Sequence, residues 1–167
     1  FNNIGRRHGA GVHCEDASSP TIRNCIVDFN ANGTASASGG GISVATGRPV
    51  VENCTIISNN VGKTNLGSGI ALRSASYAAT IRNCIVRGNG TDDLLGVTET
   101  MIHNTHVGDG EFDGVNHCFD DVLAFEDLAA QDYRLTRKSP SGLDAGVNLP
   151  WMAGATDLVG NPRVLNR

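Results

Sequence analysis

Apolar and polar residues alternate in short runs between residues 11 and 107, with glycine and asparagine between the runs. In two of these runs, Val12 is followed by Cys14 and Ile42 by Val44, each pair with a polar residue in between. A period of two places alternate side chains on opposite faces of a strand, whereas a helix needs apolar residues three and four positions apart. The pattern therefore predicts short strands, each with one buried face.

The runs belong to a repeat that is centred on an Asn-Cys pair. The pair occurs at Asn24-Cys25, Asn53-Cys54 and Asn83-Cys84, so the copies lie 29 and 30 residues apart. Matching segments surround the pairs at 21–27, 50–56 and 80–86, and shorter glycine-led matches precede them at 11–14, 41–44 and 69–72. A weaker fourth copy is Met101-Ile102-His103-Asn104.

Each copy is too short to include a helix, and its pattern predicts three strands separated by turns. One copy cannot bury its apolar side alone, but stacked copies share a continuous interior. Like strands that stack in parallel, about 4.8 Å apart, form a β-solenoid. Connections between parallel strands favour right-handed coiling.

The repeat resembles that of right-handed parallel β-helix proteins of the pectin-lyase-like superfold. Four C-terminal motifs are similar to those of bacterial surface β-helix proteins with a choice-of-anchor module: Asp132-Tyr133-Arg134-Leu135, Ser139-Pro140, Leu143-Asp144-Ala145-Gly146 and 157–163. The expected fold class is all-β, a right-handed parallel β-helix of about four coils with an irregular C-terminal segment packed on its side. Residues 1–107 would form the coils, and 108–167 an acidic loop and covering segment of the same domain.

The repeated asparagines Asn24, Asn53 and Asn83 are expected to be structural. Asparagine tolerates the left-handed backbone of a sharp corner. Its side-chain amide can also hydrogen-bond to the amide of the next copy. The sequence therefore predicts an asparagine ladder at these three positions, and a second corner at Asn30, Asn59 and Asn89.

Cys25, Cys54 and Cys84 share one repeat position, which predicts a column of buried sulfur atoms. The chain has 5 cysteines, an odd number that does not suit a complete disulfide framework. The C-x-x-C spacing typical of a zinc site does not occur. We interpret the three residues as free structural thiols that pack as small apolar side chains.

Two rows of side chains are predicted to face outward. Arg23, Glu52 and Arg82 share one position and are expected to form a charge ladder on the surface. The other row contains Ile26 and Ile85, and a stripe of large apolar side chains on a surface usually has a cover. We expect part of 119–135 to fold back over it. The covering side chains would be Phe119, Val122, Leu123, Phe125 and Leu128.

The resemblance implies that an enzyme of this superfold would act on acidic polysaccharides along the first strand of each coil, with Arg or Lys as base and acidic residues for Ca²⁺. The outward residues there with suitable chemistry are His13, Glu15 and Arg73. A catalytic base must lie within hydrogen-bond reach of the proton that it removes. Because the middle copy contributes only Ser43 and Ala45, these candidates are spread out, and we expect binding rather than catalysis.

An acidic, glycine-rich segment resembles a Ca²⁺-binding loop. Asp109, Glu111 and Asp113 stand at its first, third and fifth positions, Gly114 at the sixth and Asp120 at the twelfth. Glutamate at the third position and aspartate at the twelfth depart from the pattern. An acidic surface loop is the favoured interpretation, and Ca²⁺, held by these four carboxylates, is the candidate cofactor.

Charge and hydropathy exclude two classes of partner. The formal net charge is −4 and no basic run occurs, which argues against nucleic acid. No apolar run approaches the length of about 20 residues that a membrane-spanning helix needs. Residues 109–132 are strongly acidic and contain no lysine or arginine, so this part of the chain differs in charge from the repeat.

Three functions remain open. The first is a scaffold of a secreted or cell-surface bacterial protein that binds carbohydrate or a surface partner without turning it over. The second is a polysaccharide lyase, epimerase or hydrolase of the same fold. The third is a non-catalytic structural fragment that forms a homo-oligomer through open solenoid ends, because uncapped strand edges invite association.

Overall fold

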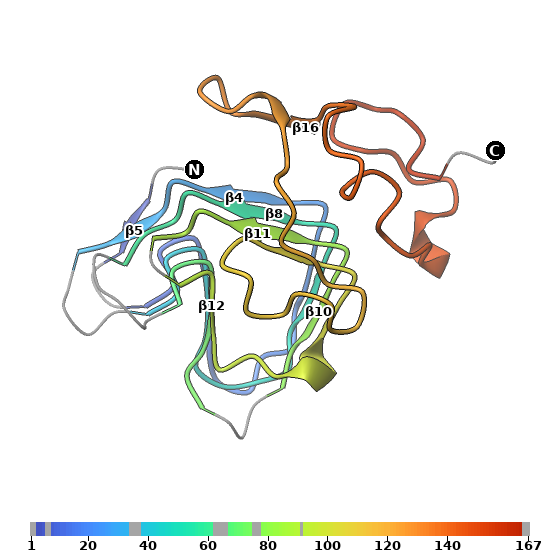
Figure 1. Cartoon of the computed structure of the whole chain (residues 1–167). Helices are drawn as coiled ribbons and strands as arrows, with labels where there is room; N and C mark the ends of the chain where they lie inside the picture. Colours follow the sequence, from blue (N-terminus) through green and yellow to red (C-terminus); the bar gives the residue numbers. More distant parts are fainter. Residues whose placement is uncertain are drawn as a thin grey trace.

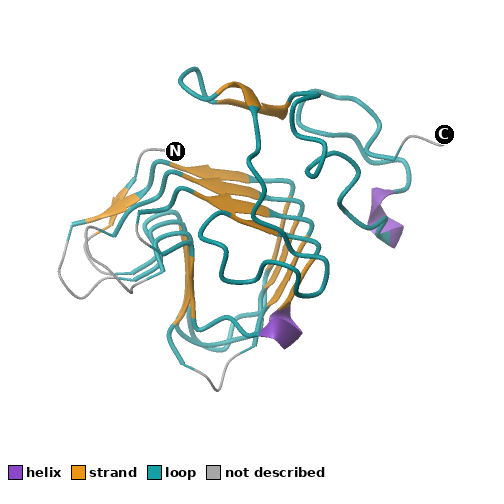
Figure 2. Cartoon of the chain, in the orientation of Figure 1, coloured by secondary structure: helices purple, strands orange, loops and turns teal. Residues whose placement is uncertain are grey.

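The computed structural model describes residues 3–5, 8–33, 38–61, 67–74, 78–90 and 92–164. Their coils lie over one another in a view along the solenoid axis (Figure 1). In these residues the regular structure is β-strand, apart from the 3-10 helices η1 (Glu99–Met101) and η2 (Pro150–Met152). The strands form the walls of the solenoid and loops form its corners (Figure 2).

Three sheets of four parallel strands form the walls. The first sheet contains β2 (Val12–Cys14), β6 (Ile42–Val44), β9 (Ile70–Leu72) and β12 (Leu94–Leu95). The second sheet contains β3 (Thr21–Arg23), β7 (Val50–Glu52), β10 (Thr80–Arg82) and β13 (Ile102–His103). The third sheet contains β4 (Ile26–Asp28), β8 (Thr55–Ile57), β11 (Ile85–Arg87) and β14 (His106–Val107). Each coil gives one strand to each sheet, so the chain is an all-β parallel β-helix, as predicted.

The register between coils places equivalent residues of the repeat above one another. In the second sheet Val51 pairs with Ile81, and Ile81 pairs with Ile102 of the weak fourth copy. These three side chains are 0–1% exposed because they fill the interior. Burial of one such side chain stabilises a protein by about 1.5–3 kcal/mol. The other inward rows are buried as predicted: Cys14, Val44 and Leu72, then Ile42, Ile70 and Leu94, then Val27, Ile56, Val86 and Val107. The prediction is wrong for the outward positions Ser43 and Ala71 of the first sheet, which are both 0% exposed.

Asparagines form the corner between the second and third sheets, which we call the Asn-Cys corner. Their φ angles are 56°, 51°, 54° and 46° at Asn24, Asn53, Asn83 and Asn104. This is the left-handed backbone that asparagine is predicted to supply. The amide ladder predicted here is wrong, because the buried Oδ1 atoms of Asn24 and Asn53 accept no hydrogen bond. The amide of Asn83 bonds instead to Val147 of the C-terminal segment.

An asparagine ladder is present at the following corner. The Nδ2 atom of Asn30 donates to Oδ1 of Asn59 at 3.0 Å, and that of Asn59 donates to Oδ1 of Asn89 at 2.9 Å. Asn3 donates to Asn30 at one end, and Asn89 donates to the carboxylate of Asp93 at the other. The left-handed residues at this corner are those just before the ladder, with φ angles of 50°, 57° and 63° at Phe29, Ser58 and Gly88.

Residues 108–119 fold across the end of the solenoid at the fourth coil, where the gold trace crosses the coils in Figure 1. Phe112 and Cys118 are 5% and 3% exposed and belong to the core there. The N–H of Phe119 donates to the carbonyl of Thr105 at 3.2 Å, and its carbonyl accepts from the N–H of Val107 at 3.0 Å. This segment therefore covers the apolar interior at that end.

The segment that follows packs on the outer side of the third sheet, as predicted. Its antiparallel hairpin contains β15 (Phe125–Asp127) and β16 (Asp132–Leu135). Leu123 is 5% exposed, and the hydroxyl of Tyr133 donates to Asp28 of β4 at 3.0 Å. The prediction is wrong for Val122 and Leu128, which are 84% and 50% exposed. Val122 points away because its extended neighbour Leu123 points inward, and Leu128 lies in the hairpin turn.

A short parallel pair, β1 (Ile4–Gly5) and β5 (Ala31–Asn32), lies outside the three walls, at the left of Figure 1. Among the residues described above, no helix is long and apolar enough to cross a bilayer. The domain division expected after residue 107 stays a prediction.

Candidate functional site

The candidate catalytic residues lie on or beside the first sheet. His13 Nε2 is 3.4 Å from Glu15 Oε2, and the His13 ring stacks on that of His8 with 6.2 Å between centroids. Backbone hydrogen bonds between coils place Arg73 two coils away from Glu15. At the spacing of parallel strands this is roughly 10 Å, too far for Arg73 to exchange a proton with the pair. The structure thus brings His13 and Glu15 together and leaves Arg73 apart.

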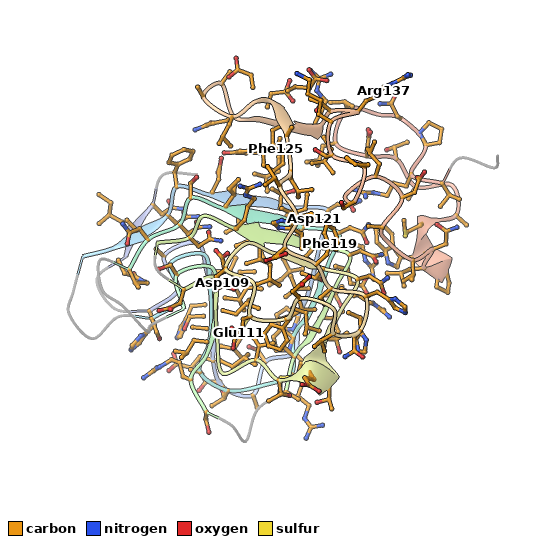
Figure 3. All side chains as sticks on the ribbon, viewed as in Figure 1. Asp109, Glu111, Phe119, Asp121, Phe125 and Arg137 are labelled. Carbon is orange, nitrogen blue, oxygen red and sulfur yellow. The ribbon has the colours of Figure 1, made fainter. Side chains whose placement is uncertain are left out.

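The candidate Ca²⁺ ligands do not form one group. Asp109 accepts hydrogen bonds from the N–H of Asp93 at 2.9 Å and from the N–H of Glu111 at 3.1 Å, so its carboxylate closes turns of the backbone. Asp109 and Glu111 belong to the segment that crosses the fourth coil (Figure 3). Within the described part of the chain, no three His, Cys, Asp or Glu side chains are arranged to hold a metal ion. The geometry therefore does not support a Ca²⁺ cage that includes Asp113 and Asp120.

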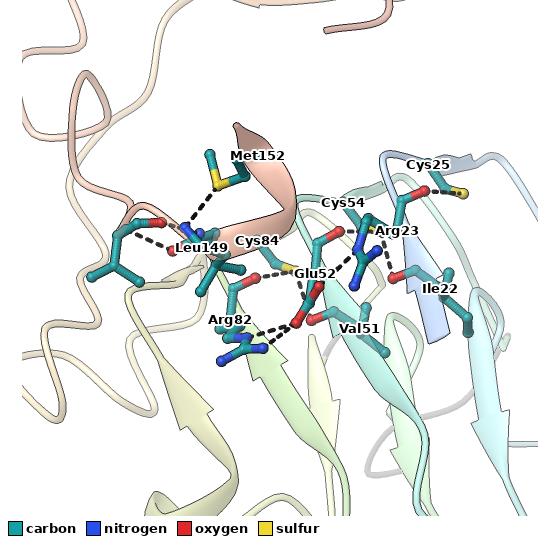
Figure 4. Close-up of polar contacts among 12 residues, drawn as sticks. Ile22, Arg23, Cys25, Val51, Glu52, Cys54, Arg82, Cys84, Leu149 and Met152 are labelled. Atoms are coloured by element: carbon teal, nitrogen blue, oxygen red, sulfur yellow. Dashed lines mark hydrogen bonds and ion pairs between the residues drawn. The ribbon is translucent and has the colours of Figure 1, made fainter. Parts of the chain in front are cut away.

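The Asn-Cys corner carries the predicted column of thiols (Figure 4). Cys54 and Cys84 are 2% and 3% exposed. Cys25 is exposed, contrary to the prediction, because its coil stands at the edge of the stack. Each of the three thiols donates at 3.2 Å to the carbonyl two residues before it. In the fourth coil Thr105 replaces cysteine, and its hydroxyl makes the same bond at 2.9 Å.

The predicted charge ladder is present on the outer side of the second sheet. Glu52 accepts from Nε of Arg23 and from Nε of Arg82, each at 2.8 Å (Figure 4). Burial acts to raise the pKa of Glu52, but the hydrogen bonds from Arg82 and Arg23 outweigh it and hold the pKa below its ordinary value. The side chain of Glu52 is 1% exposed, so the prediction of a surface ladder is wrong for its central member.

The cover over this ladder is part of the C-terminal segment. The Trp151 ring lies 4.2 Å from Cζ of Arg23 and 5.8 Å from Cζ of Arg163, both within the range of a cation–π contact. Such contacts are stronger where water is excluded. Trp151 therefore connects the first coil to the last described residues of the chain.

A groove of about 210 Å³ lies between the Asn-Cys corner and the C-terminal segment, and we call it the corner groove. The corner contributes Cys25, Asn53 and Thr55. The C-terminal segment contributes Tyr133, Arg134, Asp157, Leu158, Val159 and Arg163. The groove exists only because residues far apart in the sequence fold against each other.

Two polar groups of the corner groove have no hydrogen-bond partner among the described residues. They are the terminal nitrogen atoms of Arg163, whose Nε donates to a backbone carbonyl at 3.1 Å, and the hydroxyl of Thr55. Asp157 accepts from backbone N–H groups of its own turn at 2.8 and 2.9 Å, and these bonds lower its pKa. Arg134 is paired with Asp132, Nε to Oδ1, at 2.8 Å. The groove can therefore offer a ligand the hydroxyl of Thr55 and the terminal N–H groups of Arg163, whose guanidinium also interacts with Trp151 and with the carboxylate of Asp157.

A family model described as the right handed beta helix region matches residues 1–115. The chain belongs to the right-handed β-helix family. No significant match was found among curated proteins or solved structures. The match to the right-handed β-helix family covers the four coils and most of the segment across their end, but not the segment that completes the corner groove.

Sequence reasoning missed the corner groove of this right-handed β-helix. One signal was present, since the motifs at 132–135 and 157–163 each contain an aspartate and an arginine within a few residues. However, nothing in the sequence indicates which coil these motifs contact. The placement of Arg163 near Thr55 needed the structure.

Proposed function

We propose that this chain is a non-catalytic β-helix scaffold that binds an acidic polysaccharide in the corner groove, at the surface of a bacterial cell or outside it. The observation that supports this function is the grouping of the Arg163 guanidinium and the Thr55 hydroxyl in one groove. A guanidinium forms two parallel hydrogen bonds to a carboxylate such as that of a uronic acid. The hydroxyl groups of the sugar match the hydroxyl of Thr55.

Both walls of the corner groove are held in place before a ligand arrives. The stacked coils fix Thr55, which pairs with Ile26 and Ile85 in the third sheet. The C-terminal wall is tied to the first coil by the hydrogen bond from Tyr133 to Asp28. A site that needs little ordering on binding loses less entropy. This rigidity supports a role in binding.

A surface location is part of the proposal, and the resemblance of the C-terminal motifs to choice-of-anchor surface proteins supports it. In this fold the motif residues hold the hairpin. Ser139 is 0% exposed, and its hydroxyl accepts from the N–H of Ala124 at 2.6 Å and donates to the carbonyl of Ala124 at 3.0 Å. Tyr133, from the first motif, is part of the wall of the groove.

The test is calorimetry with oligogalacturonate and with a neutral oligosaccharide of equal length, each with and without Ca²⁺. We expect the acidic ligand alone to bind, and Arg163→Ala to weaken binding about tenfold, as the loss of a charge-assisted hydrogen bond predicts. Arg48→Ala is the matched control, because Arg48 is exposed and lies outside the groove. Equal affinity for the neutral sugar, or an equal loss in the Arg48 variant, would refute the proposal.

One observation favours the enzymatic alternative, namely the contact between His13 and Glu15 at 3.4 Å on the first sheet. A carboxylate beside an imidazole can orient it as a general base. A lyase would release an unsaturated uronate, which absorbs ultraviolet light. Release of this product by the natural chain and its loss in His13→Ala would favour a lyase over the scaffold.

A further inference from the structure

The thiol column at the Asn-Cys corner has one exposed member beside a buried one. Cys25 is exposed, Cys54 is 2% exposed, and both are free. Cys25 lines the corner groove and also a second cavity of about 170 Å³ at the first coil. A small reagent in solution can therefore reach Cys25, whereas Cys84 is enclosed by the coils.

The two thiols belong to neighbouring rungs that are in register. The N–H of Thr55 donates to the carbonyl of Cys25 at 2.9 Å, and Ile26 pairs with Thr55 just beyond them. Parallel strands lie about 4.8 Å apart, which is within the Cα separation of roughly 4.4–6.8 Å that a disulfide spans. The sulfur of Cys54 also lies 3.6 Å from the carbonyl of Ile22, so it leans toward the coil that contains Cys25.

We propose that Cys25 and Cys54 form a redox-active pair that a low-molecular-mass disulfide oxidises. The Cys25 thiolate attacks one sulfur of the reagent, so that a mixed disulfide forms and one thiol leaves. The Cys54 thiolate then attacks the sulfur of Cys25 and expels the second thiol. The two protein thiols give up two electrons and two protons, and the reagent is reduced to two thiols.

Its position suits Cys54 to the second step. It stands on the rung next to Cys25 and leans toward that coil, so once Cys25 carries the mixed disulfide, Cys54 is the thiol beside it. Thiol–disulfide exchange proceeds through the thiolate, which mildly alkaline pH supplies. Thiol–disulfide exchange runs in both directions, so an added dithiol reduces the bond again. The modification is therefore reversible, and it does not depend on polysaccharide binding.

The experiment incubates the reduced chain with oxidised glutathione at mildly alkaline pH, stops the reaction with acid, and records intact and peptide masses. The natural chain is expected to lose the mass of two hydrogen atoms and to link the peptides that contain Cys25 and Cys54. Cys54→Ala should stop at a stable glutathione adduct on Cys25. Cys25→Ser should not react at that site, and it keeps the core because Cys25 is exposed.

Cys84→Ala is the matched control, since it removes the third member of the column and leaves the pair intact. It should still form the link, and equal thermal unfolding of the variants checks that each is folded. A stable adduct on the natural chain would overturn the proposal. So would a link that forms without Cys25.

Discussion

Asn83 and Val147 form two hydrogen bonds although 64 residues separate them. The Nδ2 of Asn83 donates to the Val147 carbonyl at 2.8 Å, and its Oδ1 accepts from the Val147 N–H at 2.9 Å. The side-chain amide of Asn83 thereby pairs with Val147 as the peptide group of a neighbouring strand would, because it has both an N–H donor and a carbonyl acceptor. Asn104 adds a bond to the carbonyl of Ala145 at 3.2 Å. The corner asparagines thus attach the C-terminal segment to the coils.

Asn83→Gly should loosen the C-terminal segment without disturbing the corner. Glycine accepts the left-handed φ of 54° at this position, so only the amide is lost. We expect the free energy of unfolding to fall by about 1–2 kcal/mol. Hydrogen exchange measured by mass spectrometry should become faster at residues 145–149.

Asn24→Gly is the control for this prediction. Asn24 has nearly the same backbone, with φ of 56°, but its Oδ1 accepts no hydrogen bond. It should leave exchange at 145–149 unchanged. Equal acceleration in both variants would show that the corner backbone, and not the amide of Asn83, holds the segment.

Asn59→Ala should destabilise the fold more than any change at the Asn-Cys corner. Asn59 is 0% exposed and bonds to the amides of Asn30 and Asn89. Alanine would leave both neighbours without their partner in the interior, at a cost of about 1–3 kcal/mol each. Urea denaturation measures the loss. Thr55→Ala, which removes a hydroxyl without a partner among the described residues, should stay within about 0.5 kcal/mol of the natural chain.

Glu52→Gln should lower stability at neutral pH and have less effect in acid. The pKa of Glu52 is lowered in the folded chain, so the unfolded chain binds the proton more readily. The stabilisation is therefore present above the ordinary glutamate pKa of about 4.3 and is lost as the pH falls through the folded value. At neutral pH we expect a loss of about 1–3 kcal/mol, because Arg23 and Arg82 lose a shared partner and are themselves partly exposed.

Urea denaturation of the natural chain and of Glu52→Gln at neutral pH and in acid would measure this difference. It should shrink as the pH falls. A difference that grows in acid would mean that Glu52 is more stable as the protonated form, contrary to the direction of its pKa.

The coils could be predicted because the residues that define each coil lie close together in the sequence and recur in every copy. Strand period, corner asparagines and the spacing of Asn-Cys pairs each indicated the same stack, and the register of Ile81 with Val51 agrees. The ladder was placed at the wrong corner because both corners carry asparagine in every copy. Only the backbone distinguishes them, since left-handed residues occupy Asn53 at one corner and Ser58, just before Asn59, at the other.

The corner groove could not be predicted, because single contacts without a repeat create it. Tyr133 contacts Asp28 across 105 residues, and no periodic pattern in the sequence connects them.

For the candidate catalytic residues, the repeat predicted the correct wall but not a distance that allows them to act together. Periodicity placed His13 and Arg73 on the same wall, but the coil that lies between them keeps their side chains apart.

The carboxylate of Asp93 accepts from the backbone N–H and the side chain of Asn89, both at 2.9 Å. Unlike an amide, a carboxylate has no hydrogen atom to pass on. The series of side-chain donors that runs from Asn3 through Asn30, Asn59 and Asn89 therefore ends at Asp93. Only the backbone N–H of Asp93 extends the line, to the carboxylate of Asp109. Two acceptor-only side chains thus end the line of amides at the coil that residues 108–119 cover.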